Sequence, residues 1–128
     1  MNHLVLILTA ALLGTGVHAA EFHVAVDGDD AHPGTQTRPF ATLQRGHEAA
    51  APGDTVFVHG GTYVVAGERA AGVVLSKSGE PDKHIRFFAF ADERPVIECR
   101  GLTSPERPVG VKVTGSWLHL IRLLEPRA

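Results

Sequence analysis

Apolar residues recur along this chain in short runs separated by turn-forming residues. The two strongest runs are Val-rich residues 55–58 and the Ile-Arg-Phe-Phe-Ala-Phe segment at residues 85–90. Short runs rich in β-branched and aromatic residues predict strands. Weaker runs predict further strands at residues 22–26, 72–75, 96–98, 109–114 and 117–120. Residues 64–71, which are small and mixed, are expected to form a loop with a brief extended piece, and residues 101–108, with two prolines, are expected to form a loop.

One apolar stripe has helical spacing instead, at Phe40, Leu43, His47 and Ala50. Pro39 suits the first position of a helix, and Thr37 just before it could cap that helix. The Pro-Gly-Asp sequence at residues 52–54 ends the segment. A helix this short is not stable alone, so we expect it to lie across the end of the strands.

Short strands between turns would also suit a β-sandwich. However, the turns lack the two-residue Asn-Gly or Asp-Gly loops that mark hairpins, since Asp27-Gly28 precedes a long loop. The strands are also short and strongly apolar, as expected when each stacks between similar strands. The pattern therefore favours parallel coils over a sandwich.

Several motifs follow one another in a recognisable order: DGDD at 27–30, PGT at 33–35, PFATLQ at 39–44, PGDTVFV at 52–58 and GGTY at 60–63. This order resembles the N-terminal cap and first coil of secreted right-handed parallel β-helix proteins, closest to the pectate lyases of polysaccharide lyase family 9. Residues 78–97 and 110–120 are similar to later strand patterns of that family, although Lys83-His84 stand where a proline is common. The resemblance implies an all-β fold, a single-stranded parallel β-helix solenoid with a short N-terminal capping α-helix.

Length and composition fit one exported domain. The chain has 128 residues, 44% of them hydrophobic, and a formal charge of −2 without any basic run, which gives no case for nucleic-acid binding. Residues 4–13 are apolar except for Thr9, too short a run to span a bilayer, and small residues follow at 17–19. We interpret residues 1–20 as a signal peptide and residues 21–128 as the mature, secreted or periplasmic domain, with no membrane association after cleavage. A buried N-terminal helix is the alternative. Cys99 is the only cysteine, so the chain forms no internal disulfide.

The resemblance also implies a reaction, the β-elimination of a uronic-acid polymer. In that reaction Ca²⁺ neutralises the sugar carboxylate and a lysine removes the adjacent ring proton. In the family these groups lie on middle coils beyond the matched region, so no catalytic, cofactor-binding or metal-binding residue carries over to this chain. Whether the chain alone is an enzyme stays open, while Ca²⁺ is expected for the full-length protein and acidic polysaccharide is its expected partner. The alternatives are a non-catalytic β-helix module for carbohydrate binding or surface scaffolding, and a lyase of alginate or chondroitin.

Candidate site residues all have a structural interpretation beside the functional one. Asp27, Asp29 and Asp30 could supply oxygen ligands to Ca²⁺, but His32 occupies the position where an EF-hand needs glycine, so a turn is favoured. The histidines of the mature chain show no metal-ligand spacing; they are His23, His32, His47, His59, His84 and His119. Lys77, Lys83 and Lys112 are the only lysines, and Lys112 is expected to face solvent. Trp117 and Tyr63 could stack on sugar rings, but packing is the favoured role.

The end of the sequence carries an apolar stretch at residues 118–124. After the helix there are residues for about two coils, whereas solenoids need about three or more repeats and a capping end. We therefore expect the N-terminal portion of a longer β-helix, truncated after about two coils. Self-association through this open coil is expected if the chain folds alone.

Overall fold

The computed structural model describes residues 19–105 and 108–123. In this part of the chain the elements are, in order, β1 (Glu21–Val24), α2 (Leu43–Ala49), β2 (Thr55–Val58), β3 (Gly61–Gly67), β4 (Ala71–Leu75), β5 (Ile85–Ala89), β6 (Pro95–Leu102), β7 (Val109–Val113) and β8 (Leu118–Ile121). Every strand pairing between them is parallel.

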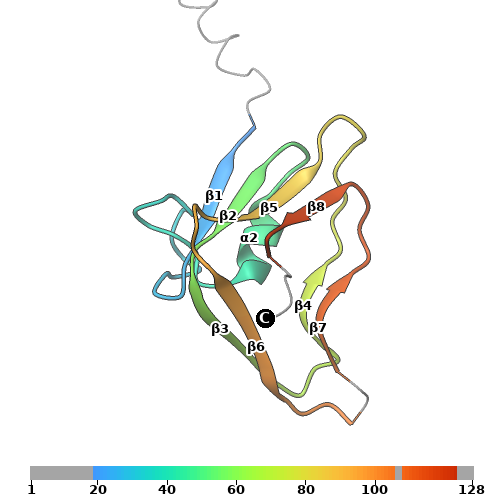
Figure 1. Cartoon of the computed structure of the whole chain (residues 1–128). Coiled ribbons are helices and arrows are strands. Elements are labelled where there is room, and N and C mark those ends of the chain that lie inside the picture. The colour runs from blue at the N-terminus through green and yellow to red at the C-terminus, as the bar shows by residue number, and fades with distance from the viewer. Residues whose placement is uncertain (1–18, 106–107, 124–128) are drawn as a thin grey trace, which may run out of the picture.

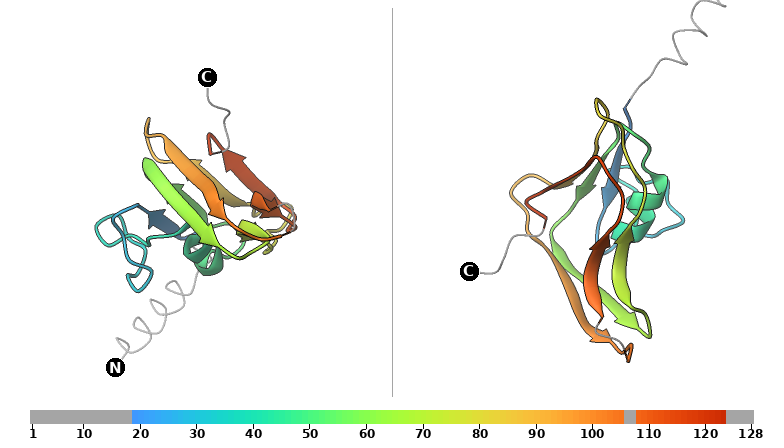
Figure 2. Two further views of the ribbon diagram at one scale, coloured as in Figure 1. Left: turned by 90° about the horizontal axis from the view of Figure 1, so that it is seen from below. Right: turned by 90° about the vertical axis from the view of Figure 1, so that its right-hand side faces the viewer.

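The strands form the three sides of a coil. Sheet A has the order β1-β2-β5-β8, sheet B pairs β3 with β6, and sheet C pairs β4 with β7. Thr55 pairs with Arg86 and Arg86 pairs with His119, so successive coils advance by 31 and then 33 residues. Figure 1 shows the three sheets around a common interior, with α2 lying across it, and Figure 2 shows the strands of each sheet side by side. The predicted parallel β-helix of about two coils is confirmed.

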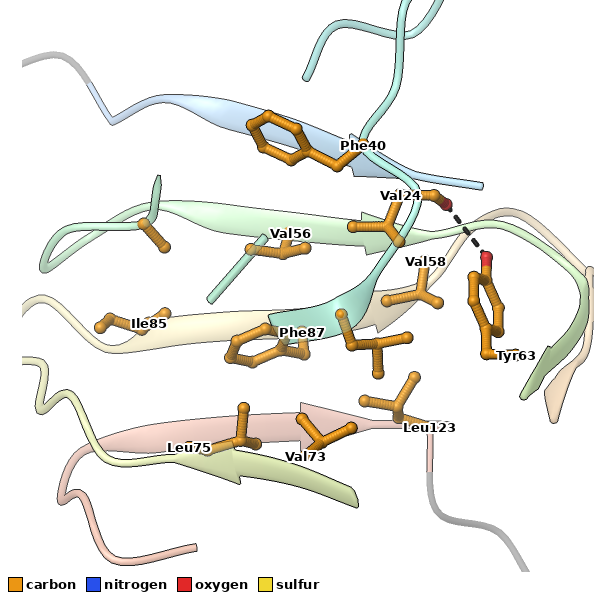
Figure 3. Packing of buried hydrophobic residues seen from close by; sticks show 12 residues of the cluster. Val24, Phe40, Val56, Val58, Tyr63, Val73, Leu75, Ile85, Phe87 and Leu123 are labelled. Carbon is orange, nitrogen blue, oxygen red and sulfur yellow. Dashed lines mark hydrogen bonds between the residues drawn. The ribbon is translucent and has the colours of Figure 1, made fainter. Parts of the chain in front are cut away.

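The core lies between the three sheets and is built from columns of stacked side chains (Figure 3). Val56 of β2 is in register with Phe87 of β5, which is in register with Leu120 of β8. Val56 and Phe87 are fully buried, and Leu120 packs against them. Because strand residues alternate between faces, the intervening residues of sheet A project outward.

The helix begins later than the sequence predicted. Its first residue is Leu43, and its N-cap is Thr42, whose hydroxyl accepts a hydrogen bond from the Arg45 N–H at 3.1 Å. Pro39 and Thr37 therefore do not start it. The reason is Asp30, whose Oδ1 accepts from the Ala41 and Thr42 N–H groups at 2.8 and 3.0 Å and so holds these two residues outside the helix.

Phe40, which the sequence placed inside the helix, lies in an isolated parallel bridge with Val24 of β1. Its N–H donates to the His23 carbonyl at 2.9 Å, and its own carbonyl accepts from Ala25 N–H at 2.9 Å. The outer edge of sheet A is thereby covered by the segment that leads into the helix. The predicted apolar stripe is nevertheless confirmed, since Phe40, Leu43, His47 and Ala50 are all buried.

Side chains of α2 cover the edge of sheet C. The Gln44 amide donates to the Val74 carbonyl at 2.9 Å and accepts from the Val74 N–H at 2.8 Å, as a neighbouring strand would. Gly46 allows the helix to lie directly on the coil, because a Cβ there would come within 2.9 Å of Val24 Cγ2 and 3.0 Å of Val56 Cγ1. An unpaired strand edge can pair with another strand. Gln44 and the Phe40 segment together cover the edges of two of the three sheets, C and A, at the first coil.

β3 takes up residues 64–67 of the expected loop at 64–71, whereas β6 takes up only residues 101–102 of the expected loop at 101–108. β3 extends to Gly67 and β6 to Leu102, and these two strands pair with each other across a bulge between Val64 and Ala66. Ala66, Gly67 and Gly101 have little strand preference, so the ends of these strands arise from pairing between coils and not from local propensity.

The opposite end of the coil is formed by β6, β7 and β8, which have no further strand neighbour within the described residues. Leu118 and Leu120 face inward and are partly buried, and Leu123 is 7% exposed. Self-association through this end stays a prediction, and residue 124 of the apolar stretch lies outside the described part. The interpretation of residues 1–20 as a signal peptide also concerns mainly undescribed residues. No helix in residues 19–105 and 108–123 is long and apolar enough to cross a membrane.

Candidate functional site

The outer face of sheet A carries an unusual concentration of aromatic and imidazole rings. Outward positions on neighbouring strands lie in register: Glu21, Thr55, Arg86 and His119 form one row, and His23, Phe57, Phe88 and Ile121 form the next. His59 and Phe90 extend this face beyond the second row, and His84 and Trp117 lie beyond the first. Solvent-facing sheets are ordinarily polar, so this face is the candidate functional surface.

One end of the face is a histidine pair. Nδ1 of His23 and Nε2 of His59 are 2.9 Å apart, and Nδ1 of His59 is 3.7 Å from the Glu93 carboxylate. Glu93 also accepts from the Gly60 N–H at 2.8 Å. Burial lowers the pKa of His23, and the neighbouring His59 lowers that pKa further, against a smaller opposing effect of Glu21.

His23, His59 and Glu93 are arranged like a catalytic base and its orienting groups, but the His23 imidazole is enclosed by the protein. His23 is 7% exposed and is packed against Phe57 and Phe90, with ring centroids 5.3 and 5.5 Å away. A catalytic base must come within hydrogen-bond distance of the proton that it removes. The His23–His59 pair therefore stabilises the first coil and does not present a base to a substrate.

The other end of the face is open. Trp117 is 50% exposed, and its ring stacks on His84 with centroids 5.6 Å apart and planes 16° apart. His119 meets His84 edge-on at 5.6 Å. Arg86 is in register with His119. We call Trp117, His84, His119 and Arg86 the ring platform.

The backbone at Trp117 is held in an uncommon conformation, with φ of 58°. Its carbonyl accepts from the Ile85 N–H at 3.1 Å, and the preceding Ser116 bonds to Gly79 and Ser78 at 2.9 Å each. A bulky residue at positive φ costs free energy and persists where the surroundings fix it. The backbone that carries the Trp117 ring is thus held in place by its neighbours.

Of the three acidic residues near the N-terminus, Asp29 and Asp30 take structural roles. Asp29 Oδ1 accepts from the Ala31 N–H at 2.8 Å, and both oxygens of Asp30 accept from the turn before the helix, Oδ2 from the Thr42 hydroxyl at 2.9 Å. Asp29 and Asp30 thus already use carboxylate oxygens in hydrogen bonds to the protein, so the segment does not present three free carboxylates to a Ca²⁺ ion. Across the described residues, no group of three or more His, Cys, Asp or Glu side chains could hold a metal ion.

The lysines do not gather beside a carboxylate cluster either. Lys77 Nζ donates to the carbonyls of Glu48, at 2.9 Å, and Ala50, and so binds the end of α2. Lys83 forms a turn in which its N–H and carbonyl both bond to Glu80. Lys112 is exposed on β7, as expected.

Tyr63 packs inside the coil and does not stack on a ligand. It is 6% exposed, and its hydroxyl lies 2.6 Å from the His59 carbonyl and 3.1 Å from the Val24 carbonyl (Figure 3). Burial raises its pKa well above the ordinary value. Beside it an open cavity of about 590 Å³ lies between the start of α2 and strands β3 and β4, lined mainly by apolar residues such as Val65 and Val73.

Sequence reasoning named His84, His119 and Trp117 only singly and did not name Arg86 as a site residue. The available signal was the spacing, because Trp117 follows His84 by 33 residues and His119 follows Arg86 by 33 residues. A repeat of one coil length places such residues side by side in a solenoid.

Comparison with known proteins agrees with this geometry. The family model described as "Pel9A-like, right handed beta helix region" matches residues 22–124. Pectate lyase PEL9 of Emericella nidulans is 30% identical over 88 residues, which is 69% of this chain and 20% of that protein. The uncharacterised protein YwoF of Bacillus subtilis is 32% identical over 84 residues, 66% of this chain and 17% of YwoF.

Among solved structures, a rhamnogalacturonan lyase superposes with a TM-score of 0.68 at 29% identity, covering 80% of this chain and 27% of the lyase. The chain thus spans about a fifth of the curated relatives it matches and about a quarter of this lyase. Since the family model covers most of the sequence and the parallel coils match its described fold, the chain belongs to the Pel9A-like right-handed β-helix family.

Proposed function

We propose that this chain serves as the N-terminal cap and first coils of a pectate-lyase-like β-helix that acts on acidic polysaccharide. The observation that carries this is the match of residues 22–124 to the Pel9A-like region, supported by relatives named as a pectate lyase and a rhamnogalacturonan lyase. The reaction proposed for the full-length protein is calcium-assisted β-elimination, with Ca²⁺ and the base held by coils other than these. Export is part of the proposal and rests on the apolar run at residues 4–13 and the small residues that follow.

The structure supports a capping and templating role for these residues. At one end α2, Gln44 and the bridge at Phe40 cover the edges of sheets C and A. At the other end β8 offers a parallel edge in register with three earlier strands. A solenoid buries its core by stacking on such an edge, so the cap end and the growing end are distinct.

A chimera tests this proposal. Residues 21–123 would replace the matched cap and first coils of Pectate lyase PEL9, and the chimera would be assayed for unsaturated product from polygalacturonate with Ca²⁺ or with a chelator. We expect calcium-dependent activity in the chimera and none in the isolated chain. A chimera with Gln44→Ala and Gly46→Val serves as the matched control, because these changes damage the cap and leave the lyase coils untouched.

Folded chimeric protein without activity would contradict the proposed role. Activity in the isolated chain would contradict the assignment of catalysis to other coils.

A further inference from the structure

The ring platform has no role in capping or in the core, yet it is ordered. Trp117 is half exposed while its backbone is fixed at φ of 58° by neighbouring loops. An exposed tryptophan gains little stability from burial, and strained backbone is stored where function or packing demands it. The exposed ring is therefore available to a ligand.

The charge of the platform indicates what kind of ligand. Arg86 is half-buried on the outer face, and within the described residues no carboxylate lies within ion-pair distance of its guanidinium. Glu21, in the same row, is two strands away, about 10 Å at the usual strand spacing. A guanidinium presents a planar fork of donors that matches a carboxylate. The platform therefore has an anion-binding group without a protein partner.

The spacing suits one ring that carries a carboxylate. Two residues of extended backbone span about 6.6 Å, so Arg86 of β5 lies about one pyranose width from His84, which directly precedes that strand. His119 stands beside Arg86 on the next strand, and Trp117 stands beside His84. Aromatic rings pack against the apolar face of a sugar, while Arg86 and His119 can donate to a carboxylate at the neighbouring position.

We infer that the ring platform of Trp117, His84, His119 and Arg86 is a binding subsite for a uronate residue of an acidic polysaccharide, separate from any catalytic centre. The inference deepens the proposed function and names a site on the first coils for its substrate class. The subsite holds the polymer on the outer face of sheet A, beside β5 and β8. It needs no metal ion, because the guanidinium supplies the positive charge.

The test uses Trp117, the only tryptophan of the chain, as its own reporter. The full chain is titrated with oligogalacturonate in a chelator, and tryptophan emission is followed. We expect a saturable change in emission, and a much smaller one with the methyl-esterified oligomer, whose rings are the same but uncharged. No change, or equal changes with both oligomers, would overturn the inference.

Variants separate the platform from general charge attraction. Arg86→Gln is expected to weaken binding about tenfold, the loss of one charge-assisted contact. Lys112→Gln removes the same charge from sheet C and is expected to bind as the unaltered chain does. Equal affinity of these two variants would overturn the inference.

Affinity electrophoresis through gels containing polygalacturonate gives a second readout, in which Trp117→Ala is expected to lose retardation and Trp117→Phe to keep part of it. Retardation of Trp117→Ala equal to that of the unaltered chain would contradict the stacking role. An emission change that depends on protein concentration without ligand would show that a second copy covers the platform, and would also contradict the proposal.

The outcome is independent of the lyase assay. Binding with an inactive PEL9 chimera would leave the subsite standing and refute the proposed catalytic context. An active chimera, together with no uronate binding by the chain, would support the proposed catalytic context and refute the subsite.

Discussion

His47 makes the attachment of the cap dependent on pH. The side chain is 1% exposed, and its Nε2 accepts hydrogen bonds from the Ser76 and Lys77 N–H groups at 3.0 and 3.1 Å. An imidazole nitrogen accepts only while it carries no proton, so these bonds require neutral His47 with its proton on Nδ1. Burial lowers the pKa of His47 below its usual value, and the nearby Lys77 charge lowers it further.

The direction of the effect follows from this shift. Unfolded His47 has a pKa of about 6.5, so the unfolded chain takes up a proton first as the pH falls. The contribution of His47 to stability is complete above about pH 6.5 and is lost below it. Each pH unit removes about 1.4 kcal/mol until the pKa of the folded state is reached, so the ceiling at pH 5 is about 2 kcal/mol.

The perturbation is His47→Gln, whose amide oxygen can accept from the same two N–H groups and does not titrate. Urea unfolding of both proteins would be measured at about pH 7.5, 6 and 5. We expect the free energy of unfolding of the unaltered chain to fall faster than that of the variant, by up to about 2 kcal/mol at pH 5. The other histidines, including His23 with its own lowered pKa, titrate in both proteins and cancel in the comparison. Parallel pH profiles would refute the reasoning.

Three further substitutions and one control substitution test the cap and the core by thermal or urea unfolding. Gly46→Ala should destabilise the folded chain, because the overpacking cost of about 1–3 kcal/mol against Val24 and Val56 outweighs a helix-propensity gain of about 1 kcal/mol. A variant more stable than the unaltered chain would contradict the direct contact between α2 and the coil. Asp30→Ala should cost about 1 kcal/mol or more with or without Ca²⁺. Asp27→Ala should be near neutral, because the Asp27 carboxylate accepts no hydrogen bond from residues 19–105 and 108–123. Calcium-dependent stabilisation that is lost in Asp30→Ala would restore the metal interpretation. Phe87→Ala should cost about 3–5 kcal/mol, since its ring fills the middle of the core column, and a cost below about 1 kcal/mol would argue against that column.

The strands that local composition dictates were predictable from the sequence. The runs at 55–58 and 85–90 are apolar enough on their inward faces to specify β2 and β5 alone. β3 and the end of β6 were missed because residues such as Ala66 and Gly101 have little strand preference and become extended only through pairing across coils.

The start of the helix was misplaced for a similar reason. Pro39 carries a local signal for a helix start, but Asp30 binds the N–H groups of Ala41 and Thr42 from eleven and twelve residues away and moves the start to Leu43. A hydrogen bond from a side chain across a loop does not change the helical spacing of apolar residues, so that spacing cannot reveal it. The ring platform was not predictable for the same reason, because its members come from two strands and from the segments just before them, which only the coil length aligns.

The central claim is that successive coils stack in parallel with the stated register, and nuclear magnetic resonance can test it most directly on this 13.6 kDa chain. Scalar couplings across hydrogen bonds identify each donor together with its acceptor. The structure predicts couplings from the His59 N–H to the Val24 carbonyl, from Phe90 to Val58, and from Ile85 to Trp117, each joining one coil to the next. Couplings that pair these donors with other carbonyls, as in an antiparallel sandwich, would contradict the parallel coil. They would also contradict the helical cap, the ring platform and the proposed function, because all three are argued from that coil.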